Sequence, residues 1–279
     1  MSLVATHADR ASEREIASRF VKARLGFEAI SAYPGALPES LSQAYAIQDQ
    51  AIALWPGEVR GWKLGRIPDP LVQRYGADRL AGPIFSGNIW PMIDDDNGVA
   101  VPVINGGFAA VEAEYLIRIN RDVSPDERSW TREEAVDLID EVLTGIELAG
   151  SPLSLINDLG PAVTASDFGN NAGLIVGKRV EDGIARLDDL ECRMLIEGGE
   201  VGRGRAGNLP GGPLQALVFL LDLHARRGIS LRAGDLISTG AVTGVHRIEA
   251  GQRALADFGT DGSIACHARA ADADAGDSS

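Results

Sequence analysis

The chain is poor in cysteine and in basic residues. Only two cysteines, Cys192 and Cys266, occur in 279 residues. They are too few to build a metal site by themselves, and a reduced cytosolic thiol pair is the simplest expectation. Lysine and arginine number 26 against 40 aspartates and glutamates, which gives a formal net charge of −14. A nucleic-acid partner needs a basic footprint, so this balance argues against one.

Long apolar runs and targeting signals are also missing. No apolar run approaches the length that crosses a bilayer, and the segment from Met1 to Arg14 is polar, without the core of a signal peptide. Hydrophobic residues make up 45% of the chain and charged residues 24%, which is ordinary for a globular protein. The sequence contains no internal repeat and no low-complexity linker. We therefore expect a soluble, acidic, cytoplasmic protein without a membrane partner.

Helical periodicity dominates the first part of the chain. Apolar residues recur at helical spacing over residues 12–24 and again over residues 40–54, where Pro56 and Gly57 stop the pattern. The glycine-flanked segment 59–65 is typical of a strand and carries Lys63 among apolar neighbours. Further strands are predicted over residues 83–85, 111–119, 174–176, 190–197, 236–239, 252–258 and 263–268.

Two helices and two loops are predicted between these strands. Thr131 is a good N-cap for a helix over residues 131–142, and Pro213 and Gly228 bracket a second helix over residues 213–227. Residues 161–167 and 202–207 are predicted to be loops. The second loop carries arginines that could select a dicarboxylate substrate if the loop closes over a site.

This order of elements lacks the regular strand–helix alternation of a doubly wound fold. It favours an α+β fold with a helical N-terminal region over residues 1–80 and a β-rich, metal-binding catalytic domain over residues 81–269. The small, acidic residues 270–279 are predicted to form a disordered tail.

Three glutamates in apolar segments carry the strongest functional signal. Period-2 geometry places Glu112 and Glu114 on the same face of the strand over residues 111–119, where adjacent carboxylates require protonation or a cation. Glu147 lies in an apolar run, where an ionised side chain is costly unless it is paired or bound to metal. Three oxygen ligands favour Mg²⁺ or Mn²⁺ over Zn²⁺. By spacing alone, Glu112 and Glu114 more often form the solvated face of an edge strand.

Five short motifs follow one another along the chain: GWKLG from residue 61, EAE from residue 112, IELAGS from residue 146, DFGNNAG from residue 167 and GDLISTG from residue 234. Together they resemble the 2-keto-4-pentenoate hydratase family, which lies within the fumarylacetoacetate hydrolase superfamily and includes 4-oxalocrotonate decarboxylases. The resemblance spans roughly residues 16–268.

The resemblance implies a mixed β-roll that holds Mg²⁺ or Mn²⁺, and a homo-oligomeric assembly. Glu112, Glu114 and Glu147 would be the metal ligands. Lys63 would lie beside the metal and contact a 2-oxo acid or its enolate. The substrate-binding residues that it implies are Asp167, Asn170, Asn171, Thr239 and Gly240.

The chemistry of the residues fits this implication. A 2-oxo acid chelates a cation through its carboxylate and keto oxygens, and the cation stabilises the enolate formed on proton loss. A nearby lysine adds positive charge where negative charge develops. The predicted activity is hydration of a small 2-oxo/2-hydroxy-dienoate from aromatic meta-cleavage catabolism. The same enolate would also serve a 2-oxo-enedioate decarboxylase or an acylpyruvate-type C–C hydrolase, and a non-catalytic partner subunit is a further alternative.

Two positions depart from the hydratase pattern. Gly87 stands where the hydratases carry an acidic residue proposed for proton transfer, and Gly212 precedes Pro213 where they carry a histidine. Both departures concern the hydration step rather than the metal ligands. His246, in the loop after Thr239, is a candidate replacement acid or base, although an ordinary loop histidine explains it as well.

Overall fold

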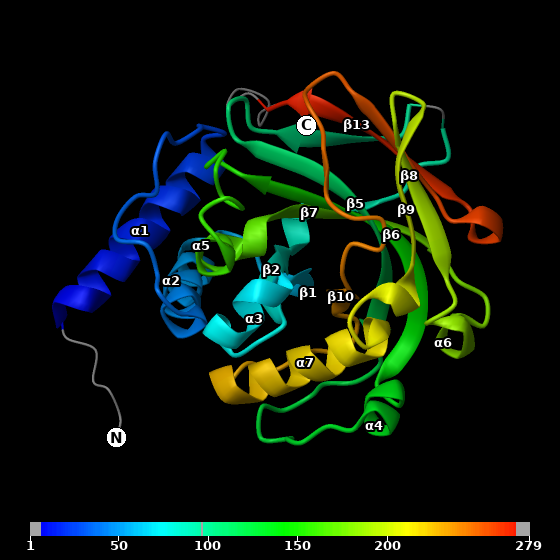
Figure 1. The fold of residues 1–279 in the computed structure, drawn as a ribbon, viewed down its shortest axis with the longest axis horizontal. Coiled ribbons are helices and arrows are strands. Elements are labelled where there is room, and N and C mark those ends of the chain that lie inside the picture. The colour runs from blue at the N-terminus through cyan, green and yellow to red at the C-terminus, as the bar shows by residue number, and fades with distance from the viewer. Residues whose placement is uncertain (1–6, 96, 272–279) are drawn as a thin grey trace.

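The computed structural model describes residues 7–95 and 97–271. Its core is a large mixed sheet of eight strands and a smaller mixed sheet of five (Figure 1). The larger sheet has the order β2 (Arg79–Phe85), β1 (Val59–Arg66), β10 (Leu236–Ser238), β5 (Phe108–Ile119), β6 (Ile139–Ser151), β7 (Asn171–Arg179) and β3 (Ile89–Pro91), and β11 (His246–Arg247) also pairs with β5.

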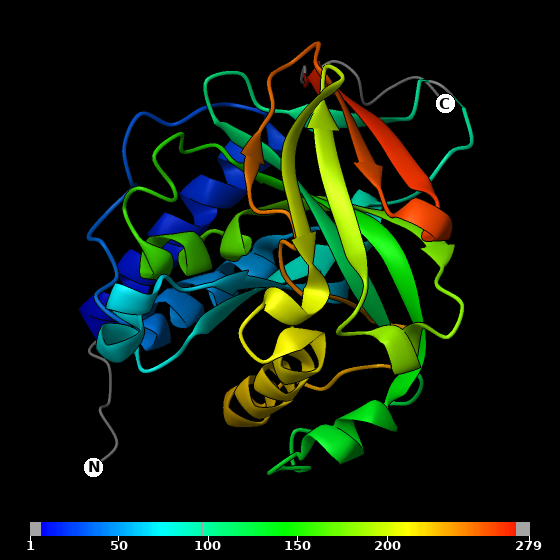
Figure 2. The ribbon, with the colours of Figure 1, turned by 45° about the vertical axis from the view of Figure 1, so that its right-hand side comes forward.

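The smaller sheet is built from later parts of the chain together with one early strand. Its order is β4 (Val99–Val103), β13 (Ser263–Ala270), β12 (Arg253–Asp257), β8 (Glu191–Ile196) and β9 (Gly199–Arg205). Figure 2 shows the β8–β9 hairpin (yellow-green) beside β12 and β13 (orange and red). Both sheets contain parallel and antiparallel pairs, and the α+β fold class predicted from the sequence is confirmed.

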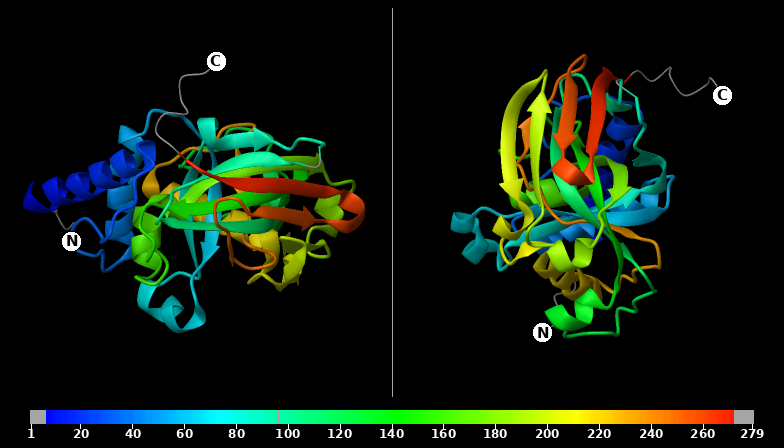
Figure 3. Two further views of the ribbon diagram at one scale, coloured as in Figure 1. Left: turned by 90° about the horizontal axis from the view of Figure 1, so that it is seen from above. Right: turned by 90° about the vertical axis from the view of Figure 1, so that its right-hand side faces the viewer.

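Seven α-helices surround these sheets in the described part of the chain. They are α1 (His7–Leu25), α2 (Leu41–Leu54), α3 (Asp69–Tyr75), α4 (Arg132–Val136), α5 (Pro161–Ser166), α6 (Gly183–Arg186) and α7 (Gly212–Arg227). Figure 3 shows that the first part of α1 extends away from the rest of the fold. The N-cap of α2 is Ser40, whose hydroxyl accepts a hydrogen bond from the Gln43 amide, and α7 ends at Gly228 in the left-handed conformation. Both helices were predicted, the first from its apolar spacing and the second from Pro213 and Gly228.

Strand β5 separates an apolar face from an acidic one. Val111, Ala113 and Tyr115 belong to the main core together with residues of the smaller sheet. The Tyr115 ring packs edge-to-face on Phe258 at 5.3 Å, and its hydroxyl donates a hydrogen bond to the Glu191 carbonyl oxygen. Burial of each large apolar side chain contributes about 1.5–3 kcal/mol. Because side chains alternate along a strand, this packing turns Glu112 and Glu114 toward the opposite face.

The predicted helix over residues 131–142 is wrong beyond its first turns. The N-cap at Thr131 is confirmed, but α4 ends at Val136 and β6 begins at Ile139. Residues from Ile139 onward pair with β5 along almost its whole length. The apolar spacing that suggests a helix is therefore satisfied by burial in a central strand, because long-range pairing overrides local propensity.

Both predicted loops are also wrong. Residues 161–166 form α5, which starts at Pro161 and is buried at every position. Most of the second loop is strand β9, which completes the hairpin with β8. A Cβ at Gly204 would lie 1.9 Å from the Val242 carbonyl oxygen, so this strand packs directly on the loop that follows β10.

Three further expectations concern the chain as a whole. Cys192 and Cys266 are free and buried. Among the described residues, no helix is long and apolar enough to cross a membrane. The tail predicted over residues 270–279 lies outside the described residues from position 272 onward, and the division at residue 80 remains a prediction.

Candidate functional site

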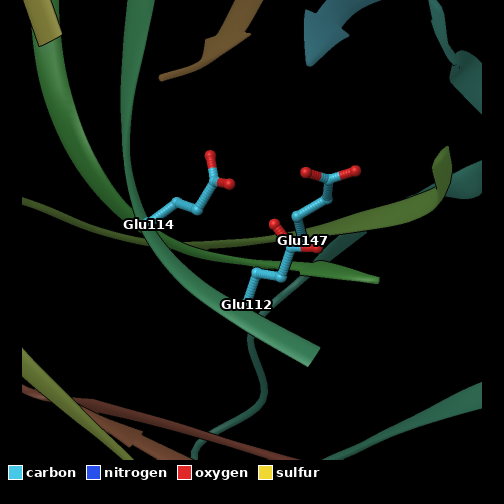
Figure 4. Close-up of side chains that lie close together, drawn as sticks. All are labelled: Glu112, Glu114 and Glu147. Carbon is cyan, nitrogen blue, oxygen red and sulfur yellow. The ribbon is translucent and has the colours of Figure 1, made fainter. Parts of the chain in front are cut away.

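Three glutamates from neighbouring strands meet on the inner face of the larger sheet. Glu112 and Glu114 project from β5, and Glu147 lies directly opposite Glu112 on β6. Figure 4 shows the three side chains extending to the same side of the two strands. One carboxylate oxygen from each lies within 4.8 Å of the others, and none of the three residues is more than 4% exposed. This spacing suits three oxygen ligands around one hard cation.

The electrostatics of this cluster favour binding of a cation. Burial and the nearby Glu147 charge outweigh the attraction of Lys63 and raise the pKa of Glu112 to about 8. Burial, Glu147 and Glu112 also raise the pKa of Glu114 well above its usual value. Glu114 Oε1 and Glu147 Oε2 are buried and have no hydrogen-bond partner among the described residues, although a buried carboxylate oxygen normally has one.

Lys63 on β1 is the buried cation of the site. Its Nζ lies 3.1 Å from Glu147 Oε1 and donates a hydrogen bond to Asn170 Oδ1, also at 3.1 Å. Burial alone would lower the pKa of Lys63, but the charges of Glu147, Glu112 and Glu114 raise it above its usual value. The ammonium group therefore stays charged. Among the described residues, Asn170 and Glu147 take two of its three N–H donors, and the third is left for a ligand.

Backbone and side-chain donors hold two of the glutamates in place. Ser238 at the end of β10 donates a hydrogen bond to Glu114 Oε2, and the Gly240 amide donates to the same oxygen at 2.9 Å. Asn171 Nδ2 donates to Glu147 Oε1 at 3.0 Å. These contacts leave the other oxygen of Glu114 and of Glu147 available, because each carboxylate is held through one oxygen only.

The segment before Asn171 is a left-handed turn that presents Asn170 to the site. Phe168, Gly169 and Asn170 all have positive φ, at 55°, 62° and 57°. Such a conformation costs energy for the two residues with a Cβ and persists only when its surroundings enforce it. A Cβ at Gly82 would lie 1.9 Å from the Phe168 carbonyl oxygen, so β2 packs against this turn with no space for a side chain.

Arg24, near the end of α1, holds this turn in place through an ion pair and several hydrogen bonds. Its Nε donates to Asp167 Oδ1 at 2.6 Å, and its other nitrogens donate to the backbone oxygens of Asn171, Gly150 and Asp167. The second oxygen of Asp167 accepts a hydrogen bond from Ser151 at 2.6 Å. Both partners of this ion pair are buried, with side-chain exposures of 7% and 0%.

Replacing Arg24 with methionine is expected to lower the free energy of unfolding by about 3–5 kcal/mol. The substitution keeps most of the apolar stem but leaves Asp167 buried without its counter-charge. Urea unfolding followed by tryptophan fluorescence measures the change. Arg19→Met, at an exposed position of the same helix, is the matched control. A loss below about 1 kcal/mol for Arg24→Met would mean that the ion pair does not hold this turn.

A cavity of about 510 Å³ opens above the cluster. This size is typical of sites for small ligands. From the predicted site, Glu112, Lys63, Asn170, Thr239 and Gly240 line it. The remaining wall is largely apolar, with three further charged groups. These residues include Leu64, Leu71, Leu80, Leu209, Val245, Arg66, Arg79 and Asp158.

The other predicted substrate-binding groups lie beside the cavity rather than in its wall. Asp167 and Asn171 are occupied by the contacts described above and are at most 4% exposed. Thr239 and Gly240, in the loop after β10, do line the cavity. The Thr239 hydroxyl donates a hydrogen bond to the Tyr115 carbonyl oxygen, and the Gly240 amide donates one to Glu114. The substrate contacts of these residues remain predictions.

Two positions singled out from the resemblance lie away from the cavity wall. His246 does not line the cavity; its Nε2 lies 2.9 Å from the Thr243 carbonyl oxygen, and its ring packs against Gly202 of β9. Gly87 is exposed in the short turn η1 (Ser86–Asn88), and a Cβ there would contact nothing within 4 Å.

Several functional contacts were missed from the sequence. Ser238 lies inside the motif that begins at Gly234, so the motif itself carried that signal. Arg24 and Arg79 had no such signal. Arg24 is the last residue of the predicted helical pattern over residues 12–24, and Arg79 precedes the predicted strand over residues 83–85. Asn157, which accepts a hydrogen bond from Asn170 Nδ2 at 3.0 Å, lies in a loop without a recognised motif.

Comparison with known proteins gives distant relatives and shared folds. No family model matches the chain. A 2-keto-4-pentenoate hydratase from Dechloromonas aromatica is 26% identical over 215 residues, which cover 75% of this chain and 79% of that protein. The 4-oxalocrotonate decarboxylase from Pseudomonas putida G7, complexed with magnesium and adipate, superposes with a TM-score of 0.78 at 18% identity, covering 93% of this chain and 98% of that one.

A third protein extends the similarity to other reactions. The fumarylpyruvate hydrolase from Pseudomonas aeruginosa, in complex with Mn²⁺ and pyruvate, has a TM-score of 0.58 at 16% identity, covering 77% of this chain and 91% of that one. At these identities the solved structures establish the fold, and the predicted mixed β-roll is confirmed. In sequence the chain is similar to 2-keto-4-pentenoate hydratases, and in fold it is similar to the 4-oxalocrotonate decarboxylase and the fumarylpyruvate hydrolase.

Proposed function

We propose that this protein is a divalent-metal-dependent lyase that hydrates a small 2-oxo/2-hydroxy-dienoate, as in the meta-cleavage catabolism of aromatic compounds. The observation that carries the proposal is the buried cluster of Glu112, Glu114 and Glu147 beside Lys63, at the base of a cavity of about 510 Å³. The 2-keto-4-pentenoate hydratase from D. aromatica supports the reaction class.

The donor set fits Mg²⁺ or Mn²⁺. Three carboxylates and one ammonium group leave two net negative charges (three minus one), which a divalent cation neutralises. The unpaired oxygens of Glu114 and Glu147 are the hard ligands that these ions prefer. The magnesium of the P. putida decarboxylase and the Mn²⁺ of the P. aeruginosa hydrolase support this choice.

The residues of the chain have separable roles in the proposed reaction. When bound, the cation would chelate the carboxylate and keto oxygens of the substrate and stabilise the enolate formed on proton loss. Lys63 offers its remaining N–H to a substrate oxygen, so positive charge lies where negative charge develops. Asn170 holds Lys63 in this orientation. Asp158 lines the cavity and is exposed, which makes it available to exchange a proton with the substrate carbon chain or with water.

Decarboxylation of a 2-oxo-enedioate is the second candidate. Loss of CO₂ produces the same type of enolate, so the glutamate cluster serves both reactions. The specific observation in its favour is that Arg66 and Arg79 line the cavity, since a substrate with a second carboxylate would find positive charge there.

Product analysis distinguishes the candidates. The Mg²⁺-loaded protein is incubated with 2-keto-4-pentenoate and, separately, with 4-oxalocrotonate, and the products are identified by mass spectrometry and NMR. Gain of one water supports hydration, release of CO₂ supports the decarboxylase, and two carbon fragments indicate hydrolysis. Absence of turnover for both compounds, with protein that binds Mg²⁺, would favour the non-catalytic partner subunit and contradict the proposal.

Two broader expectations accompany this function. A cytoplasmic location and a homo-oligomeric assembly remain predictions from the composition and the resemblance. Size-exclusion chromatography with light scattering measures the assembly directly.

A further inference from the structure

Asn157 contacts the site from a loop that carries no recognised motif. It lies in the connection between β6 and α5 and lines the cavity together with Lys63 and Asn170. Its Oδ1 accepts a hydrogen bond from Asn170 Nδ2 at 3.0 Å. Because Lys63 donates to Oδ1 of the same Asn170 side chain at 3.1 Å, the two ends of one amide connect Asn157 with the buried lysine.

These two contacts select one orientation of the Asn170 amide. The amide has an acceptor at one end and donors at the other. In the opposite orientation, its N–H donors would face the Lys63 ammonium group and its oxygen would face Asn157 Oδ1. Both contacts would then be repulsive, so Asn157 stabilises the orientation in which Asn170 accepts a hydrogen bond from Lys63.

The position of Asn170 decides where the remaining N–H of Lys63 points. An ammonium group has three N–H donors in a tetrahedral arrangement, and two of them are directed at Glu147 Oε1 and Asn170 Oδ1, each at 3.1 Å. With two directions fixed, the third is fixed as well. If Asn170 moved, the ammonium group could rotate about its Cε–Nζ bond, and this direction would be lost.

The loop that carries Asn157 is anchored on both sides of this residue. Ile156 is fully buried in an apolar cluster with residues of α1 and α2. The Asn157 carbonyl oxygen accepts a hydrogen bond from the Gly160 amide at 3.2 Å, and Thr164 Oγ1 of α5 lies 3.4 Å from Asn157 Oδ1. Asn157 itself is exposed, so its substitution should remove the contact with Asn170 without opening a hole in the core.

We propose that Asn157 is a positioning residue, which holds the Asn170 amide so that the remaining N–H of Lys63 points at the ligand in the cavity. The assignment of that N–H to a substrate oxygen rests on the proposed function. The contacts from Asn157 through Asn170 to Lys63 involve protein groups only, so they can be tested in the metal-free protein.

Hydrogen exchange of the Lys63 ammonium group tests this positioning directly. The sequence has three lysines, Lys22, Lys63 and Lys178; the first and last are exposed, so protein labelled with ¹⁵N in lysine gives one buried NMR signal and two internal references. We expect exchange at Lys63 to be about three- to tenfold faster in Asn157→Ala than in the wild type, because the hydrogen bond that holds its acceptor is lost. Asn157→Leu, which fills the space without an acceptor, should behave alike. Asn157→Asp retains an oxygen for Asn170 Nδ2 and should keep exchange within about twofold of the wild type.

A second set of variants shows whether Asn157 acts through Asn170. In an Asn170→Ala background, Asn157→Ala should have no further effect on exchange at Lys63. Asn105→Ala, at an exposed position between β4 and β5, is the control and should exchange as the wild type does. Thermal unfolding checks that each variant is folded. Unchanged exchange at Lys63 in both Asn157→Ala and Asn157→Leu, or an equal increase with and without Asn170, would overturn the proposal.

Kinetic measurements connect this positioning with the proposed function. For the compound that the Mg²⁺-loaded wild type converts, Asn157→Ala should lower kcat by about three- to tenfold and leave the affinity for Mg²⁺ within about twofold. The effect should appear in kcat rather than in KM, because charge develops on the substrate oxygen only as the enolate forms. A loss confined to Mg²⁺ affinity would show that Asn157 supports the glutamates instead, and would overturn the role proposed for it. Faster exchange at Lys63 in Asn157→Ala, together with a wild type that converts neither 2-keto-4-pentenoate nor 4-oxalocrotonate, would overturn the proposed function and support the positioning of Lys63 by Asn157.

Discussion

Replacing Glu114 with glutamine is expected to lower the affinity for Mg²⁺ by more than about 100-fold. Mutation of a residue that only orients a metal ligand typically lowers metal affinity about 10- to 100-fold, and loss of a ligand charge should lower it further. The substitution preserves the shape of the side chain and removes one of the three carboxylate charges in the cluster. It also leaves the other two glutamates and Lys63 in place. The loss of affinity would therefore report the missing ligand charge rather than a cavity in the core.

Calorimetric titration of the chelator-treated protein measures this effect. In the wild type, oxalate, which resembles the enolate of a 2-oxo acid, should bind only when Mg²⁺ is present. Glu114→Gln should bind neither ion nor oxalate in the same concentration range. Asp140→Asn, at an exposed position of β6, is the control and should behave as the wild type does. Mg²⁺-dependent oxalate binding that persists in Glu114→Gln would exclude Glu114 as a ligand.

Glu114→Gln should also separate the effect of Mg²⁺ binding on unfolding stability from the stability of the metal-free protein. Mg²⁺ at about 100 times its dissociation constant should stabilise the wild type against unfolding by about 2.7 kcal/mol, and it should not stabilise Glu114→Gln. In the absence of metal, the variant is expected to be at least as stable as the wild type, since the substitution removes a buried carboxylate that has a partnerless oxygen. A thermal melt with and without Mg²⁺ gives both comparisons.

Replacing Lys63 with methionine is expected to lower kcat by about 10²–10³-fold while Mg²⁺ still binds. Methionine fills the same buried space without a charge. The variant loses the cation that lies 3.1 Å from Glu147 and whose remaining N–H we assign to the substrate. Because the three glutamates then carry no protein counter-charge, the affinity for Mg²⁺ should stay the same or increase.

Steady-state kinetics together with metal titration tests this separation of roles. The control is Lys178→Met, at an exposed position of β7, which should keep both the rate and the metal affinity. If Lys63→Met retained the wild-type kcat, Lys63 would have no role in charge stabilisation. If the variant instead lost Mg²⁺ binding, Lys63 would be needed to organise the glutamates rather than to act on the substrate.

The local geometry of the site was predictable because it depends on alternation within one strand. Glu112 and Glu114 are separated by one residue, so any regular strand places them on one face and their apolar neighbours on the other. A similarly local argument succeeded for the N-cap at Thr131, whose hydroxyl accepts a hydrogen bond from the Glu134 amide three residues later. The motif resemblance then connected Glu147 and Lys63 with this strand.

The helix predicted over residues 131–142 shows where such reasoning failed. Its apolar spacing is compatible with a helix or with a central strand, and only the pairing of Ile139–Ser151 with β5 and β7 selects the strand. The supporting ion pair between Arg24 and Asp167 joins residues 143 positions apart. No sequence motif next to either residue predicts this contact.

The sequence by itself therefore determined the residues of the glutamate cluster, the face on which two of them lie and the family of the fold, since these follow from short-range alternation and from motifs. Only the tertiary structure decided that Glu147 faces Glu112, that Arg24 holds the turn before Asn171, and that Arg66 and Arg79 share a cavity with Lys63. These relations depend on sheet register and on contacts between distant segments. A pairing shifted by one residue would have turned the same side chains to opposite faces.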